Sequence, residues 1–231
     1  MTNHTYEYIF QENSLLLRIA QITQEIGIEA YLVGGFVRDL LLKRPCKDLD
    51  IVCLGSGIDF ANQLAERLNP ELNVSLFKNF GTAMFHCEGC EIEIVGARKE
   101  SYQRDSRKPI VENGTLEDDQ NRRDFTINAL AISLNKENLG ALLDPFGGLE
   151  DLRKKNIRTP LNPDVTFSDD PLLILLQILL KPSSETKNVL KLFHKNVLLT
   201  NSTKSFSPTH LLMASNCCFT QVCCILSFPK W

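Results

Sequence analysis

The stretch GGFVRDLLLKRPCKDLDIV, residues 34–52, is the most informative part of the sequence for the fold, because it connects two strands through a glycine pair and a helix. It follows an apolar run at 30–33 that has the length of a short strand. A strand that meets a helix through two glycines leaves unpaired, sterically accessible backbone N–H groups at a helix N-terminus. Such a group of N–H donors is a common binding site for phosphate. Arg38 lies in the first turn of that helix, where it can donate a charged hydrogen bond to a phosphate oxygen.

The end of the same stretch carries two carboxylates. Asp48 and Asp50 are two residues apart on the second strand, so their side chains leave the same face. Such a pair suits Mg²⁺, which binds few protein carboxylates together with substrate phosphates. Two ions of this kind can activate an attacking hydroxyl and stabilise a leaving pyrophosphate. Alone, the glycine pair is more often a tight turn and the aspartate pair a solvated strand edge. Together, in this order, they favour phosphoryl chemistry.

A second polar motif, EDDQNRRDFTINAL, occupies residues 117–130. Arg123, Asp124 and Asn128 can hydrogen-bond sugar hydroxyls and phosphates, and the last two are four residues apart, which places them on one face of a helix. The alternative interpretation is a helix N-terminus with its acids on the favourable side of the dipole. That alternative explains the acids at 117 and 118, but not two arginines followed by an apolar segment.

Hydrophobic periodicity elsewhere predicts an α/β (α+β) fold with a mixed sheet of about five strands flanked by helices. The expected helices are 15–26, 36–43, 58–68 and 115–132, the last opened by a capping box of Thr115 and Asp118. The expected strands are 30–33, 48–53, 74–78, 82–87, 91–95 and 139–144, with a turn at 145–148. After residue 180 the periodicity weakens. The cysteines at 217, 218, 223 and 224 fit incidental thiols better than a zinc site, whose ligand pairs are usually separated.

Composition excludes several classes of protein. The 231 residues are 43% hydrophobic and 23% charged, which is enough for a globular core and not typical of disordered or coiled-coil chains. The net charge of −3 gives no global basic field, although the cations at 98, 99, 104, 107 and 108 form either an RNA-phosphate contact or a solvated loop. No signal peptide or membrane-spanning run is recognisable, so we expect a cytoplasmic protein with reduced cysteines.

The two motifs, followed by DPFGGLEDLRKKNIRTP at 144–160, resemble the head domain of bacterial class II tRNA nucleotidyltransferases. These are the CCA-adding enzymes, related to poly(A) polymerases within the polymerase-beta-like superfamily. The likeness extends over about residues 27–170. It implies a nucleotidyltransferase head at 1–158, followed at 159–231 by a truncated, degenerate neck-like helix and a poorly specified tail.

The resemblance also implies roles for individual residues. The motif of Gly34, Gly35, Val37, Arg38 and Asp39 would hold the triphosphate. Asp48 and Asp50 would be the catalytic carboxylates that bind Mg²⁺. Glu93 would be a third, weaker metal ligand or else an exposed strand acid. Ribose and nucleotide contacts would come from Arg122, Arg123, Asp124 and Asn128, with Arg98 and Asp170 as further nucleotide-binding residues. Residues 144–152 would form a hinge.

The implied reaction adds CMP or AMP from CTP or ATP to a tRNA 3′ end, with release of pyrophosphate. Leu173 and Leu176 stand where the family carries arginines that read the base edge, which predicts poor discrimination between CTP and ATP. Two alternatives stay open: a poly(A)-type or relaxed-base enzyme on the same head, and an inactive nucleotide- or RNA-binding head. The oligomeric state is not predicted.

Overall fold

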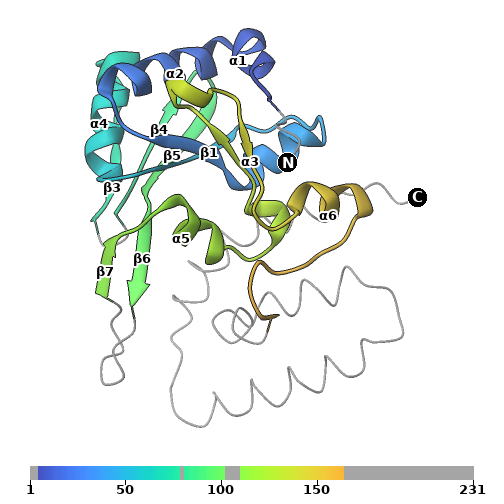
Figure 1. The fold of residues 1–231 in the computed structure, drawn as a ribbon. Coiled ribbons are helices and arrows are strands. Elements are labelled where there is room, and N and C mark those ends of the chain that lie inside the picture. Colours follow the sequence, from blue (N-terminus) through green and yellow to red (C-terminus); the bar gives the residue numbers. More distant parts are fainter. Residues whose placement is uncertain (1–4, 79–80, 102–109, 164–231) are drawn as a thin grey trace, which may run out of the picture. The chain divides into compact units, whose positions relative to one another are not determined.

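The computed structural model describes residues 5–78, 81–101 and 110–163 (Figure 1). The chain divides into two units, Met1–Leu161 and Asn162–Trp231, and the helices and strands named here belong to the first. The expected neck-like helix and tail, with Asp170, Leu173 and Leu176, lie outside the described residues. So do the cations Arg104, Arg107 and Lys108.

A seven-stranded sheet forms the centre of the unit, in the order β3-β4-β5-β2-β1-β8-β9. Its strands are β1 (Ala30–Val33), β2 (Asp48–Cys53), β3 (Ser75–Phe77), β4 (Thr82–Cys87), β5 (Cys90–Gly96), β8 (Ala131–Ser133) and β9 (Leu142–Leu143). Strands β2 and β5 pair in parallel, and the other neighbours are antiparallel. The predicted mixed sheet is confirmed, with seven strands where about five were expected.

The predicted helices on one side of the sheet are present with nearly the predicted bounds. Helix α1 (Tyr8–Glu12), which was not predicted, precedes α2 (Ser14–Ile26), and α4 (Gly57–Leu68) connects β2 to β3. Helix α2 begins where the Asn13 side chain accepts a hydrogen bond of 3.1 Å from the Leu16 N–H, and it ends at Gly27, whose φ of +76° favours glycine. Figure 1 shows α1, α2 and α4 together on this side of the sheet.

The two faces of the sheet differ in polarity. The face that carries Leu49, Ile51, Ile92 and Ile94 belongs to the main hydrophobic core, which includes buried residues of α2 and α4. On the opposite face a smaller cluster contains Tyr31, Val33, Val52, Ala97 and Ala131. Because side chains alternate along a strand, Asp48, Asp50 and Glu93 share this opposite face. The sheet therefore presents carboxylates beside its smaller apolar cluster.

The prediction of one helix over 115–132 is wrong beyond Asn121, where the helix ends. The capping box of Thr115 and Asp118 is present and opens α5 (Leu116–Asn121). The chain then turns, forms a 3₁₀ turn at Thr126–Asn128 and enters β8. Strand β8 pairs with β1, and Ala131 lies on the opposite face from Leu130 and Ile132, a strand pattern that the run of apolar letters did not reveal.

Two strands and one helix were also not predicted, and two predicted elements have different bounds. Strands β6 (Arg98–Ser101) and β7 (Ile110–Asn113) form a separate two-stranded hairpin, which projects from the main sheet in Figure 1. Helix α3 (Gly34–Leu41) begins two residues before the helix expected there. The predicted strand at 139–144 is reduced to β9, and after the turn α6 (Gly148–Lys154) follows.

No helix in the described parts of the chain has the length and apolar character needed to span a membrane.

Candidate nucleotide site

Two of the predicted metal ligands lie at the beginning of β2, on the more polar face of the sheet. Asp48 pairs with Glu91, and Asp50 pairs with Glu93 on the parallel neighbour β5. On its other side Asp50 is opposite Val33, the last residue of β1. Adjacent strands are about 4.8 Å apart, so Asp50 lies directly between the glycine turn and Glu93.

Gly34 brings the two sequence motifs into contact. Its φ is +72°, and a Cβ at this position would lie 2.8 Å from Asp50 Oδ2 and 2.9 Å from Arg123 Nη1. The absent side chain therefore leaves space that the carboxylate and the guanidinium share with the backbone turn. Asp50 and Arg123 therefore both lie close to the glycine pair.

Arg38 is buried, with 3% of its surface exposed. Its Nε and Nη2 donate to the two oxygens of Asp39 at 3.1 and 2.8 Å, and its Nη1 donates to Asn128 Oδ1 at 2.8 Å. Its guanidinium also lies close to Gly35: a Cβ added to Gly35 would be 3.4 Å from Arg38 Nη2. Arg38 thus connects α3 to the 3₁₀ turn, and its contact with phosphate stays a prediction.

Asp124 and Asn128 come together as expected, but on a turn instead of an α-helix. Asn128 Nδ2 donates to Asp124 Oδ1 at 3.0 Å and to Oδ2 at 3.2 Å, and the Phe125 N–H donates to the same carboxylate at 2.7 Å. Burial raises the pKa of Asp124 above its usual value, although these hydrogen bonds and the charges of Arg123 and Arg38 oppose that rise.

A buried carboxylate that the sequence interpretation missed holds both motif arginines. Asp119 is fully buried and forms ion pairs with Arg122 and Arg123. Burial would raise the pKa of Asp119, but the charges and hydrogen bonds of the two arginines outweigh that effect and lower it. The sequence signal was the spacing of three and four residues from Asp119 to the arginines, which places them on one side of a helical turn.

The carboxylates on the sheet face repel one another. Burial raises the pKa of Asp50 to about 6; Glu93 and Asp48 add to the rise, and the charge of Arg123 opposes it. The pKa of Glu93 is also raised, by burial and then by Glu91, again against Arg123. A bound cation would relieve this repulsion. Within the described ranges, however, no group of three or more acidic, histidine or cysteine side chains is gathered to hold a metal ion.

The donor set therefore fits an ion that takes few protein ligands. Asp48 and Asp50 offer carboxylate oxygens from one face, and Mg²⁺ commonly binds one or two carboxylates together with substrate phosphates. The participation of Glu93 stays a prediction. Arg98 begins β6, where it is opposite Asn113, and its nucleotide contact stays a prediction as well.

The segment predicted as a hinge packs beside the turn that carries Asn128. Asp144 accepts hydrogen bonds from the N–H groups of Gly148 and Leu149, at 2.6 and 2.9 Å, at the beginning of α6. Asp151 accepts from Thr126 Oγ1 at 2.6 Å and from Arg158 Nη2 at 2.8 Å. The backbone N–H of Thr126 also donates to the Arg158 carbonyl at 2.8 Å.

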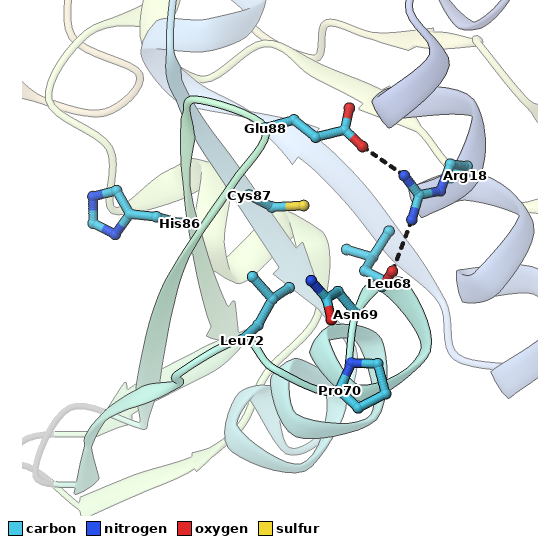
Figure 2. Close-up of a pocket in the computed structure, with 8 residues that line it drawn as sticks. All are labelled: Arg18, Leu68, Asn69, Pro70, Leu72, His86, Cys87 and Glu88. Carbon is cyan, nitrogen blue, oxygen red and sulfur yellow. Dashed lines mark hydrogen bonds and ion pairs between the residues drawn. The ribbon is translucent and has the colours of Figure 1, made fainter.

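A pocket of about 410 Å³ lies elsewhere, between α2, the end of α4 and the turn from β4 to β5 (Figure 2). Arg18 lines one side of it and donates hydrogen bonds of 2.6 Å to Glu88 and 2.8 Å to the Leu68 carbonyl. Its lining residues are Arg18, Leu68, Asn69, Pro70, Leu72, His86, Cys87 and Glu88, none of which belongs to the motifs described above.

Comparison with known proteins shows which family the chain resembles. The model of the poly A polymerase head domain family matches residues 30–158. The A-adding tRNA nucleotidyltransferase of Aquifex aeolicus is 47% identical over 148 residues, which is 64% of this chain and 18% of that protein. The CCA-adding enzyme of Streptococcus pyogenes serotype M1 is 32% identical over 210 residues, 90% of this chain and 48% of that protein.

A solved structure of a tRNA nucleotidyltransferase, complexed with a primer tRNA and an incoming ATP analogue, matches with a TM-score of 0.64 and 40% identity. The match covers 79% of this chain and 52% of that one. The chain thus spans from about a fifth to about half of the length of these proteins.

Proposed function

The chain belongs to the poly A polymerase head-domain family, and on that premise we propose that it transfers CMP or AMP from CTP or ATP to a tRNA 3′ end and releases pyrophosphate. The observation that carries the proposal is the meeting of Gly34, Asp50 and Arg123. A Cβ at the glycine turn would lie 2.8 Å from the Asp50 carboxylate and 2.9 Å from the Arg123 guanidinium, so both groups border the backbone of this turn. These are the groups that a triphosphate with a bound cation needs.

Each part of the site would handle one part of the nucleotide. The backbone N–H groups at the beginning of α3 and Arg123 Nη1 would bind phosphate oxygens. Asp124, oriented by Asn128, would accept a hydrogen bond from a ribose hydroxyl. Such positioning, together with fixed charges, supplies most of the catalysis in phosphoryl transfer.

Asp48 and Asp50 would hold Mg²⁺ on the face of β2 that also carries the smaller apolar cluster. When bound, the ion neutralises phosphate charge and lowers the pKa of the attacking hydroxyl. Arg123 would keep the partly buried Asp50 ionised until then, since its charge opposes the rise in the pKa of that carboxyl.

Similarity to an A-adding enzyme makes ATP the first nucleotide to test. The purified chain is incubated with Mg²⁺, labelled ATP or CTP, and tRNAs that end before, within or after the CC of the 3′ end. Label in the tRNA from either nucleotide supports the proposal, and equal use of both supports the relaxed-base alternative. Nucleotide binding without incorporation on any tRNA would contradict the proposal and favour the inactive head.

A further inference from the structure

We propose that Asp119 is a positioning residue of the nucleotide site, which holds Arg123 with one nitrogen presented to the phosphates at the Gly34 turn. This inference rests on the proposed function, because it assumes that a nucleoside triphosphate occupies that turn.

The contact between the two side chains fixes the guanidinium at two points. Arg123 Nε and Nη2 both lie 2.9 Å from Asp119 Oδ2. The other oxygen of Asp119 is bonded to Arg122, so the carboxylate is held from both sides. Asp119 is fully buried and cannot turn toward water. Two anchored nitrogens of a planar guanidinium also define the direction of the third.

That third nitrogen points to the site. Arg123 Nη1 lies 2.9 Å from the position that a Cβ on Gly34 would take, and Asp50 Oδ2 lies 2.8 Å from the same position. The side chain of Arg123 is 19% exposed, so its charge is partly shielded from water yet open to a ligand. The part of Arg123 that does not bind Asp119 is therefore the part that faces the phosphate position.

Asp119 also prevents Arg123 from competing with the cation for the carboxylate of Asp50. The charge of Arg123 acts on Asp50, Glu93 and Asp124, three carboxyl groups of the site. An arginine without its anchor would be drawn to Asp50, where it would occupy the oxygens that bind the cation. By binding two nitrogens, Asp119 limits Arg123 to one contact at the site and leaves Asp50 for the ion.

A double-mutant cycle tests the inference on the full chain. The measured quantity is the dissociation constant of an ATP analogue with a methylene group between its α- and β-phosphates, in the presence of Mg²⁺. Asp119→Asn removes the charge with little change of shape, and Arg123→Gln removes the group through which Asp119 is proposed to act. Glu117→Gln, an exposed acid on the same helix, is the matched control.

We expect Asp119→Asn to weaken binding about tenfold or more in the parent, the scale of a lost charged hydrogen bond. In the Arg123→Gln background the same change should cost less than twofold, and Glu117→Gln should leave affinity unchanged. Equal losses in both backgrounds would overturn the inference and leave the proposed function intact. A parent chain that does not bind the analogue would overturn the proposed function itself, and this inference with it.

A second variant covers the case in which Asp119→Asn does not fold. Arg123→Lys keeps the positive charge and leaves the pair of Asp119 with Arg122, but an ammonium group cannot span from Asp119 to the Gly34 turn. We expect this folded variant to lose nucleotide affinity about tenfold. Parental affinity in Arg123→Lys would contradict the positioning role.

Discussion

Arg38 Nη1 donates a 2.8 Å hydrogen bond to Oδ1 of Asn128, 90 residues later in the chain. Because the amide oxygen faces Arg38, the amide nitrogen faces Asp124 and donates to both of its oxygens. The two motifs of the sequence are therefore one buried hydrogen-bond network, and the orientation of Asp124 depends on a residue of α3.

Removal of Arg38 should destabilise the fold strongly. Arg38→Ala leaves Asp39 buried without its charge partner, which typically costs about 3–5 kcal/mol of unfolding free energy. Arg67→Ala, which loses only an exposed pair with Glu25 at 4.0 Å, should cost no more than about 1 kcal/mol. Urea unfolding of both variants measures the difference. Similar small losses would mean that the network of Arg38 is not a structural link.

Gly34→Ala should separate backbone strain from interference with the site. Gly34 and Gly27 have φ values of +72° and +76°, so alanine at either position should cost about 1–2 kcal/mol of stability. A Cβ at Gly27 has no atom within 4 Å, whereas one at Gly34 meets Asp50 and Arg123. We therefore expect Gly34→Ala to weaken nucleotide binding by at least tenfold, and Gly27→Ala to leave nucleotide affinity unchanged. Equal affinities in the two variants would place the phosphates elsewhere.

The contact between α6 and the Asn128 turn predicts a pH dependence of stability. Burial opposes ionisation of Asp151, but hydrogen bonds from Thr126, Asn156 and Arg158, with the charge of Arg158, lower its pKa below the usual 3.8. A carboxyl whose pKa is lowered in the folded state stabilises that state above its unfolded pKa and loses this contribution as pH falls through the folded pKa.

Asp151→Asn should therefore lower the unfolding free energy most at neutral pH, and the difference from the parent should shrink below about pH 4. Glu150→Gln, an exposed acid on the same helix, should show no such trend. Unfolding in urea at several pH values measures both. A difference between parent and Asp151→Asn that stays constant as pH falls would show that the carboxylate is not stabilised by these contacts.

Elements that are determined by interactions between residues near in sequence could be predicted, and elements that depend on contacts between distant residues could not. The strand 48–53 and the helix 15–26 follow from local periodicity and a capping asparagine, and the structure confirms both. The polar face that Asp48 and Asp50 share follows from their spacing on a strand. By contrast, β8 is a strand because β1 offers it an unpaired edge, a contact across about 100 residues that overrides local propensity.

The candidate site divides in the same way. Gly34, Asp50 and Arg123 were all identified from their motifs, but their meeting at one point requires the sheet register that places Val33 beside Asp50. Asp119 was missed because an acid in the first turn of a helix has an ordinary explanation in the helix dipole. Its burial, which distinguishes it from the exposed Glu117, is a property of tertiary packing.

The most direct test of the proposed nucleotidyl transfer is incorporation of labelled nucleotide into a tRNA that lacks its 3′ end, by the parent and by Asp48→Ala, Asp50→Ala and Glu66→Gln. Glu66 is an exposed acid of α4, which packs on the other face of the sheet. Circular dichroism and thermal unfolding check that each variant is folded. We expect incorporation by the parent and by Glu66→Gln, and none above background by the two aspartate variants. Incorporation at the parental rate by either folded aspartate variant would contradict the role of these carboxylates in nucleotidyl transfer.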